Sequence, residues 1–223
     1  NRISETLRKR YESVGTTYFC LQDEFRLGGE YDWSPETLSV FRKHLKRTYR
    51  KIKKLNTEWK TSYESFNEVM PLLLREAKNQ PESLGPWLDF RLYMDAYVTR
   101  RYEIANEEAG KLSPLIRVGE SGMYTPSYDV GVNYFSVAQA CPLMMSYSGL
   151  RAEWTQAFLK KDAIAGTWMG YGAQNPRHPW EAMFKGFHLL AWWGYMAKGL
   201  PHMAMVQPDL TIEGRFVEIG KQQ

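Results

Sequence analysis

The sequence predicts an α/β fold built on a parallel β-sheet, and three observations support this prediction. Short runs of apolar and β-prone residues alternate with segments of helical spacing, which is the pattern of parallel strands joined by crossover helices. The first run, Thr17–Leu21, has no polar alternation, as expected for a strand covered on both faces. Several runs end in a carboxylate or an aromatic residue, and ligand sites of parallel α/β folds form at such strand ends.

The first predicted strand leads into two adjacent carboxylates, Asp23 and Glu24. A helix over Ser4–Ser13, with Ser4 as its N-cap, is expected to precede the strand. Two interpretations of the carboxylates stay open. They line a ligand site at the strand end, or one of them caps the following turn while the other is solvated.

Two long helices are expected next. The first starts at Pro35, after the N-cap residue Ser34, and continues to about Asn56. The aromatic and irregular segment Thr57–Pro71 predicts a loop with short turns. The second long helix is expected over Gly85–Gly110, with its last glycine as the C-cap.

The second half of the chain continues the alternation. The expected elements are a strand over Leu115–Glu120, a strand over Leu143–Tyr147, a helix over Ala152–Lys160, a strand over Ala163–Trp168, a helix over Pro179–Gly186 and a strand over Leu189–Trp193. No internal repeat, low-complexity segment or clear linker interrupts this order, so residues 1–223 are predicted to form a single domain.

Charge and motifs argue against several function classes. The net charge is only +4, and the basic run Arg42–Lys54 has apolar positions at helical spacing, so it predicts a solvated helix face and no nucleic-acid partner. No strand leads into a Gly-x-Gly-x-x-Gly, Walker-type or Gly-x-Ser-x-Gly loop. Cys20 and Cys141 form no disulfide framework, and the four histidines lack metal-ligand spacing, so no metal or other cofactor is expected.

No membrane association is expected either. The longest uncharged apolar stretch near the end of the sequence, Gly186–Ala197, is too short to span a bilayer and contains His188. The chain opens with Asn1, without an initiator Met or a signal-peptide pattern, so a preceding segment is expected to be missing and the compartment stays open.

The residues at the predicted strand ends indicate the kind of ligand. They are Glu24, Glu120, Tyr147, Trp168, Trp192 and Trp193. Side chains collected from several strand ends are how a (β/α)8 barrel builds its site. Aromatic rings beside carboxylates suit sugars, because the C–H faces of a sugar pack on an indole while its hydroxyl groups bind charged acceptors.

Three segments carry a resemblance to a known family. They are Gln22-Asp23-Glu24-Phe25, the Leu-Asn-x-x-Trp-x-Thr motif at Leu55–Thr61, and Trp87–Arg91. Together they resemble the catalytic (β/α)8 barrel of family 42-type β-galactosidases. Trp168–Gly172, with Pro179-Trp180 and Trp192-Trp193, resembles the strand-7 to strand-8 half of related barrels. The resemblance implies that the chain covers strands 4 to 8 of a TIM barrel, about five parallel strands. Such a portion leaves two open sheet edges, so further chain segments or another subunit are expected to complete the barrel.

The resemblance also implies catalytic roles. Retaining glycosidases use two carboxyl groups about 5 to 5.5 Å apart, one as acid/base and one as nucleophile. Glu24 corresponds to the acid/base, whereas Asp23 stands where the family has an asparagine that binds the sugar. The family's nucleophile lies at the end of strand 7, but Gly166–Tyr171 contains no carboxylate. Glu120 is the best substitute by position; its alternative role is to cap the following turn.

Substrate-binding roles are predicted for Asp23, Tyr147, Trp168 and Tyr171. The same role is predicted for one of Trp192 and Trp193, because adjacent residues of a strand face opposite sides of the sheet. The sequence therefore predicts a glycoside hydrolase that acts on a β-linked carbohydrate. The alternative is a carbohydrate-binding or scaffolding barrel that has lost its nucleophile. A barrel enzyme of other chemistry, such as an isomerase or aldolase, is disfavoured by the lack of a strand-end lysine or metal cluster.

Overall fold

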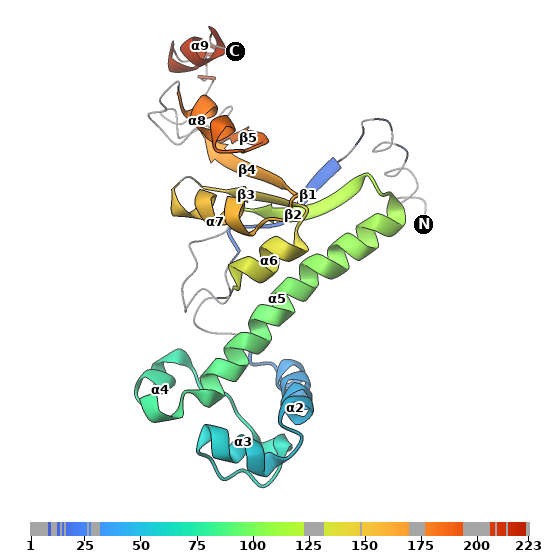
Figure 1. The fold of residues 1–223 in the computed structure, drawn as a ribbon, viewed down its shortest axis with the longest axis vertical. Helices are drawn as coiled ribbons and strands as arrows, with labels where there is room; N and C mark the ends of the chain where they lie inside the picture. Colours follow the sequence, from blue (N-terminus) through green and yellow to red (C-terminus); the bar gives the residue numbers. More distant parts are fainter. Residues whose placement is uncertain are drawn as a thin grey trace. The chain divides into compact units, whose positions relative to one another are not determined.

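A computed structural model shows how the chain folds (Figure 1). The description covers residues 9, 13, 15, 17–25, 27, 32–122, 132–147, 149–169, 177–193, 206–207, 209–212 and 214–221. The chain divides into two compact units, one of Asn1–Phe25, Tyr102–Thr125 and Ala138–Gln223, the other of Arg26–Arg101 and Pro126–Val137. These units are regions of dense packing, and the single domain over residues 1–223 stays a prediction. The predicted helix over residues 4–13 lies largely outside the described residues.

The first unit holds one sheet of five parallel strands in the order β1-β2-β3-β4-β5, as Figure 1 shows. The strands are β1 (Thr17–Asp23), β2 (Ile116–Ser121), β3 (Leu143–Ser146), β4 (Ile164–Met169) and β5 (Leu189–Trp192). Strands that follow one another in the chain are neighbours in the sheet, and all the pairs are parallel. The predicted parallel α/β sheet is confirmed, with all five strands in the expected places.

The edge strand β1 differs from the prediction of a strand covered on both faces. Phe19 is 39% exposed, and Cys20 is exposed as well. The prediction is wrong because, within the described part of the chain, β1 pairs with β2 alone, and less of the molecule packs over such an edge strand. The register with β2 also shifts, since Cys20 pairs with Gly119 and Asp23 with Ser121. Three steps along β1 therefore match two along β2, which is a β-bulge.

The two faces of the sheet have different surroundings. On one face Ala165 and Met169 pack with residues of the helices α7 (Leu150–Phe158) and α8 (His178–Phe184), and we call this the helix-side face. The opposite face, which we call the inner face, is occupied by the alternate residues of the strands. There Gly166 lies against the side chain of Met145.

The long helix α5 (Gly85–Leu112) directly precedes β2 in the chain. In the first unit, its residues Ala105 and Ala109 pack on Ile116 and Val118 at the helix-side face. The predicted C-cap at Gly110 is wrong, because that glycine is helical and the helix continues for two further residues. The helices that the sequence did not predict are α4 (Leu74–Lys78), α6 (Tyr134–Ala140) and α9 (Gly214–Lys221).

The second unit is helical. It contains α2 (Pro35–Tyr49), α3 (Ile52–Trp59), α4 (Leu74–Lys78) and the 3-10 turns Phe66–Glu68 and Pro81–Ser83, around a core that includes Phe41, Leu45, Leu55, Trp59 and Phe90. Ser34 caps α2 as predicted: its hydroxyl accepts from the Thr37 N–H at 3.2 Å. The single helix expected to about Asn56 is wrong, because Arg50 adopts φ 64° and separates α2 from α3.

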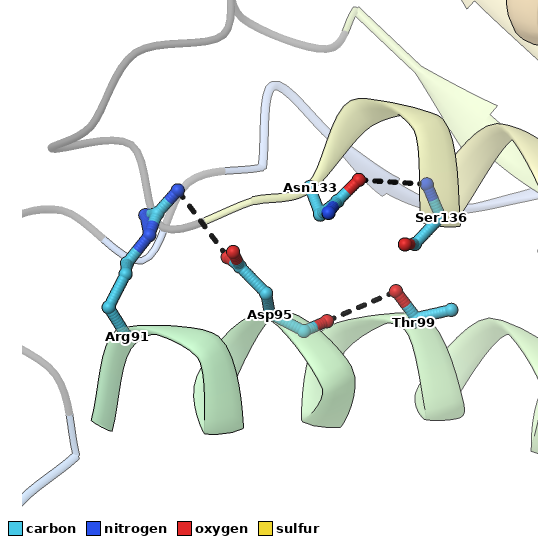
Figure 2. A network of polar contacts seen from close by, with 5 residues as sticks. All are labelled: Arg91, Asp95, Thr99, Asn133 and Ser136. Carbon is cyan, nitrogen blue, oxygen red and sulfur yellow. Dashed lines mark hydrogen bonds and ion pairs between the residues drawn. The ribbon is translucent and has the colours of Figure 1, made fainter. Parts of the chain in front are cut away.

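A buried ion pair lies on the part of α5 that belongs to the second unit (Figure 2). The Arg91 Nη2 atom is 3.5 Å from Asp95 Oδ1, and each side chain is 10% exposed. Burial raises the pKa of the Asp95 carboxyl to about 6, although the Arg91 charge acts in the opposite direction. Figure 2 also shows how α6 begins, where the Asn133 Oδ1 atom accepts from the Ser136 N–H at 3.0 Å.

Candidate active site

The backbone after β1 holds Glu24 in an uncommon conformation. Glu24 has φ 51°, in the left-handed region that residues other than glycine rarely adopt. Its N–H donates to the Ser121 carbonyl oxygen at 2.9 Å, so the end of β2 fixes this turn. Outliers of this kind are often found at functional sites, where the surrounding structure holds them in place.

Three polar groups converge on Gly122. This glycine has φ +67°, and a Cβ atom built on it would lie 2.9 Å from Asp23 Oδ1, 3.1 Å from Glu24 Cγ and 3.1 Å from Tyr147 Oη. The Gly122 N–H donates to the Met145 carbonyl oxygen at 2.7 Å, which ties the turn to β3. Asp23, Glu24 and Tyr147 therefore lie together at the carboxyl ends of β1 and β3, as the sequence predicts for a strand-end site.

Hydrogen bonds connect these groups in two chains. The Tyr147 hydroxyl donates to Glu24 Oε1. The Trp168 Nε1–H donates to Ser121 Oγ at 3.1 Å, and the Ser121 hydroxyl donates to Asp23 Oδ1 at 3.0 Å. The β-bulge in β1 makes the second chain possible, because it brings Asp23 into register with Ser121.

An arginine and a second indole border the group. The Arg151 guanidinium carbon lies 4.7 Å from the centre of the Tyr147 ring, a cation–π contact. The Trp168 and Trp193 rings meet edge to face, with centroids 6.4 Å apart and an interplanar angle of 82°. Trp193 is 45% exposed. Together Trp168 and Trp193 form an aromatic corner beside the Ser121–Asp23 bond.

The two adjacent tryptophans face opposite ways, as strand alternation requires. Trp192 packs against the helix-side cluster that contains Phe187 and Met169. Trp193, by contrast, contacts the inner-face residue Trp168. Of the predicted pair, the structure thus brings Trp193 to Trp168 on the inner face and places Trp192 with the helix-side cluster. The predicted residue Tyr171 lies outside the described residues.

Glu120 lies on the helix-side face of β2, away from the inner-face group. It is fully buried, and its Oε2 atom accepts from the Tyr102 hydroxyl. Burial raises the pKa of the Glu120 carboxyl to about 8; the charge of Asp23 adds to the shift, and hydrogen bonds from Tyr102 and the Phe25 N–H oppose it. A nucleophilic role for Glu120 stays a prediction, and its burial does not favour it.

The sequence offers no other carboxylate near the end of β4. Residues 163–180 contain no Asp or Glu. The next one, Glu181, lines a cavity of about 320 Å³ together with Ala152, Met169, Ala182 and Phe187. Those neighbours form the helix-side cluster, and Trp168 of the inner-face group lines the same cavity.

Sequence reasoning missed three members of the group: Ser121, Gly122 and Arg151. One signal was available, because alternation along β2 places Ser121 on the face opposite Glu120. Among the described residues, no set of three or more His, Cys, Asp and Glu side chains is arranged to hold a metal ion. None of the described helices combines the length and apolar character needed to cross a bilayer.

Solved structures with a similar fold are sugar-cleaving enzymes built on barrels. The catalytic domain of a β-amylase from Paenibacillus polymyxa matches with a TM-score of 0.70 and 12% identity, over 99% of this chain and 65% of that one. A β-galactosidase from the psychrophilic Marinomonas ef1 matches with a TM-score of 0.67 and 14% identity, over 99% of this chain and 41% of that one. An exo-β-agarase matches with a TM-score of 0.65 and 18% identity, over 99% of this chain and 37% of that one. The fold is therefore that of part of a glycoside hydrolase (β/α)8 barrel, as predicted.

The family follows from the sequence match. A family model described as β-galactosidase, of glycoside hydrolase family 42, matches residues 1–183. This chain belongs to that family, which confirms the resemblance inferred from its motifs. A search of curated proteins found no match. The chain spans less than two thirds of the length of each of the three solved structures.

Proposed function

We propose that this chain carries catalytic residues of a glycoside hydrolase that cleaves a β-linked sugar, with Glu24 as the general acid/base. The convergence of Asp23, Glu24 and Tyr147 around Gly122 is the observation that supports the proposal. Convergent polar groups beside an aromatic surface are what a sugar site requires. The Trp168–Trp193 corner supplies that surface.

The hydrogen bond from Tyr147 suits the acid role of Glu24. When the Tyr147 hydroxyl donates to Oε1, the carboxyl proton is left on Oε2, from where it can pass to the leaving oxygen of the substrate. The left-handed backbone and the bond to the Ser121 carbonyl hold the carboxyl in place for this transfer.

Replacing Glu24 with Gln tests the role. We expect hydrolysis of aryl β-glycosides to fall roughly 10² to 10⁴-fold, the usual worth of a general acid/base. The matched control is Glu108→Gln, which changes an exposed glutamate paired with Lys111 on α5. Wild-type turnover by the Glu24→Gln protein would refute the assignment, and so would an equal loss in both variants.

A second candidate is a barrel that binds carbohydrate without cleaving it. The lack of any carboxylate in residues 163–180 favours this alternative. Calorimetry with β-linked oligosaccharides, combined with product analysis, separates the two functions, because this candidate gives heat of binding without product.

We also propose that further polypeptide completes the barrel. The strands β1 and β5 are the two ends of the sheet order, and this chain matches only part of longer barrels. Amide hydrogen exchange of β1 and β5 in the intact protein tests this: protection equal to that of β3 supports the completed barrel, and fast exchange contradicts it.

A further inference from the structure

The inner-face group has an acid candidate, Glu24, and the other carboxylate placed in the group within the described residues is the adjacent Asp23, which accepts from Ser121. Glu120 is buried on the opposite face of β2, and residues 163–180 contain no carboxylate. Retaining hydrolysis has a known chemical alternative, in which a group of the substrate itself attacks the anomeric carbon. The 2-acetamido group of an amino sugar can do this, because its carbonyl oxygen reaches that carbon in a five-membered ring.

We propose that the site takes 2-acetamido-2-deoxy-β-glycosides and that Asp23 orients the acetamido group for attack. This inference rests on the proposed function, in which Glu24 is the acid/base. It assigns Asp23 a role that the carboxylate suits better than the asparagine of the resembled family. An ionised carboxylate only accepts hydrogen bonds, so it matches the N–H of an acetamido group.

The position of Asp23 supports this role. The bulge between Cys20 and Asp23 brings the carboxylate into register with Ser121, whose hydroxyl donates to Oδ1. Ser121 in turn accepts from the Trp168 indole N–H, so the carboxylate and the indole are held beside each other. Such fixed positioning is what an intramolecular attack needs, because it removes the freedom of the reacting groups in advance.

The surroundings also fit the two ends of an acetamido group. Its methyl needs an apolar wall, which the Trp168–Trp193 corner provides next to Asp23. Its polar atoms need acceptors and donors, and Asp23 Oδ1 and Tyr147 Oη both lie within 3.1 Å of the missing Cβ of Gly122. Because residue 122 has no side chain, Asp23, Glu24 and Tyr147 can approach its backbone this closely.

The reaction runs in two balanced steps. In the first, the acetamido carbonyl oxygen forms a bond to the anomeric carbon while the glycosidic C–O bond breaks. Glu24 gives its proton to the leaving oxygen, and the Asp23 carboxylate stabilises the N–H of the resulting oxazolinium ion. In the second, Glu24 takes a proton from water, whose oxygen bonds to the anomeric carbon as the ring opens. Glu24 is then protonated again, and the sugar keeps its configuration.

Paired substrates on the intact protein test the inference. We expect kcat/KM for aryl N-acetyl-β-hexosaminides to exceed that for aryl β-galactosides at least about tenfold, because only the former carry the attacking group. Fluorination of the acetyl group should slow wild-type turnover with each added fluorine, since it weakens the carbonyl oxygen as a nucleophile. This second measurement needs no variant, so it holds even where a variant fails to fold.

Asp23→Asn is the matching substitution, and we expect it to lower turnover of the acetamido substrate roughly 10²-fold. The control is Asp162→Asn, which changes an exposed aspartate just before β4, at the end of the sheet opposite Glu24. An Asp23→Asn loss shared equally by the acetamido and galactoside substrates would indicate a general defect and overturn the role.

The outcomes distinguish this inference from the proposed function. Cleavage of β-galactosides with no cleavage of acetamido sugars overturns the inference and leaves the proposed function standing. Turnover of acetamido sugars that is insensitive to fluorination overturns substrate participation. Binding of a thiazoline analogue of the acetamido sugar, lost in Asp23→Asn but without turnover, supports the ligand class and refutes the hydrolase. If the protein neither binds nor cleaves these sugars, both the inference and the proposed function are overturned.

Discussion

Within the described residues, each face of the sheet has a tyrosine hydrogen-bonded to a glutamate, and the two pairs differ in the exposure of the glutamate. The helix-side pair joins Tyr102 to the fully buried Glu120. The inner-face pair joins Tyr147 to the exposed Glu24. Both carboxylates follow or end neighbouring strands, so from sequence they look equivalent.

The difference shows that the face of the sheet decides what a strand-end carboxylate can do. A buried carboxyl resists ionisation, so the burial of Glu120 does not favour a role in contact with a ligand. An exposed carboxyl held by the backbone and by a phenol can exchange protons with a bound molecule. Three predictions test this contrast.

The largest expected effect is on the pH dependence of stability, and it concerns the helix-side pair. The pKa of Glu120 is about 8 when folded against 4.5 for the free group. The folded state therefore holds the proton more tightly, and this stabilisation is complete below pH 4.5 and is lost as the pH rises through about 8. The free energy of unfolding should fall by up to about 1.4 kcal/mol per pH unit within that window.

Glu120→Gln should remove that slope, because the amide does not ionise, whereas Glu24→Gln should leave it in place. Urea unfolding of the three proteins between pH 5 and pH 9 measures the difference. Parallel curves for wild type and Glu120→Gln would show that Glu120 is not the group responsible.

The fold was largely predictable because its signals are local. Runs such as Leu143–Tyr147 are apolar and bounded by breakers, and β3 forms there over Leu143–Ser146. The cap and proline at Ser34 and Pro35 likewise located the start of α2. The break at Arg50 had no such signal, since arginine is a good helix former and neither glycine nor proline lies near it.

The site was only partly predictable because its contacts join distant parts of the chain. Glu24 and Tyr147 could be proposed from their places at strand ends. The bond between Ser121 and Asp23 spans 98 residues, and it depends on a β-bulge that no composition pattern marks. The sequence groups Glu120 with Glu24 for the same reason, since alternation gives the opposite faces of one strand but not which face will hold the site.

The next effect concerns the two tryptophans of opposite faces. Trp192→Ala should cost about 2 kcal/mol of stability, because the indole packs on the buried helix-side cluster but stays partly exposed. Trp193→Ala should cost less than about 1 kcal/mol, because its ring is largely outside the core, yet it should weaken binding of a β-linked sugar about fivefold through the lost stacking. Thermal unfolding and calorimetry measure the two responses. Equal stability losses would mean that Trp193 is also a packing residue.

A smaller loss of stability than that of Trp192→Ala is expected at Gly122, where substitution separates backbone strain from crowding of the inner-face pair. Gly122→Ala should cost about 1 to 2 kcal/mol, because a Cβ at φ +67° is strained and also meets Asp23, Glu24 and Tyr147. Gly186→Ala is the matched control: its φ is also positive, at +86°, but its Cβ would touch only Gln156 at ordinary contact distances. Both variants should lose stability, and only Gly122→Ala should also lose sugar binding, because the new methyl would displace the Asp23, Glu24 and Tyr147 side chains. If Gly122→Ala binds sugar like wild type, the exact placement of these three side chains is not what binds the sugar.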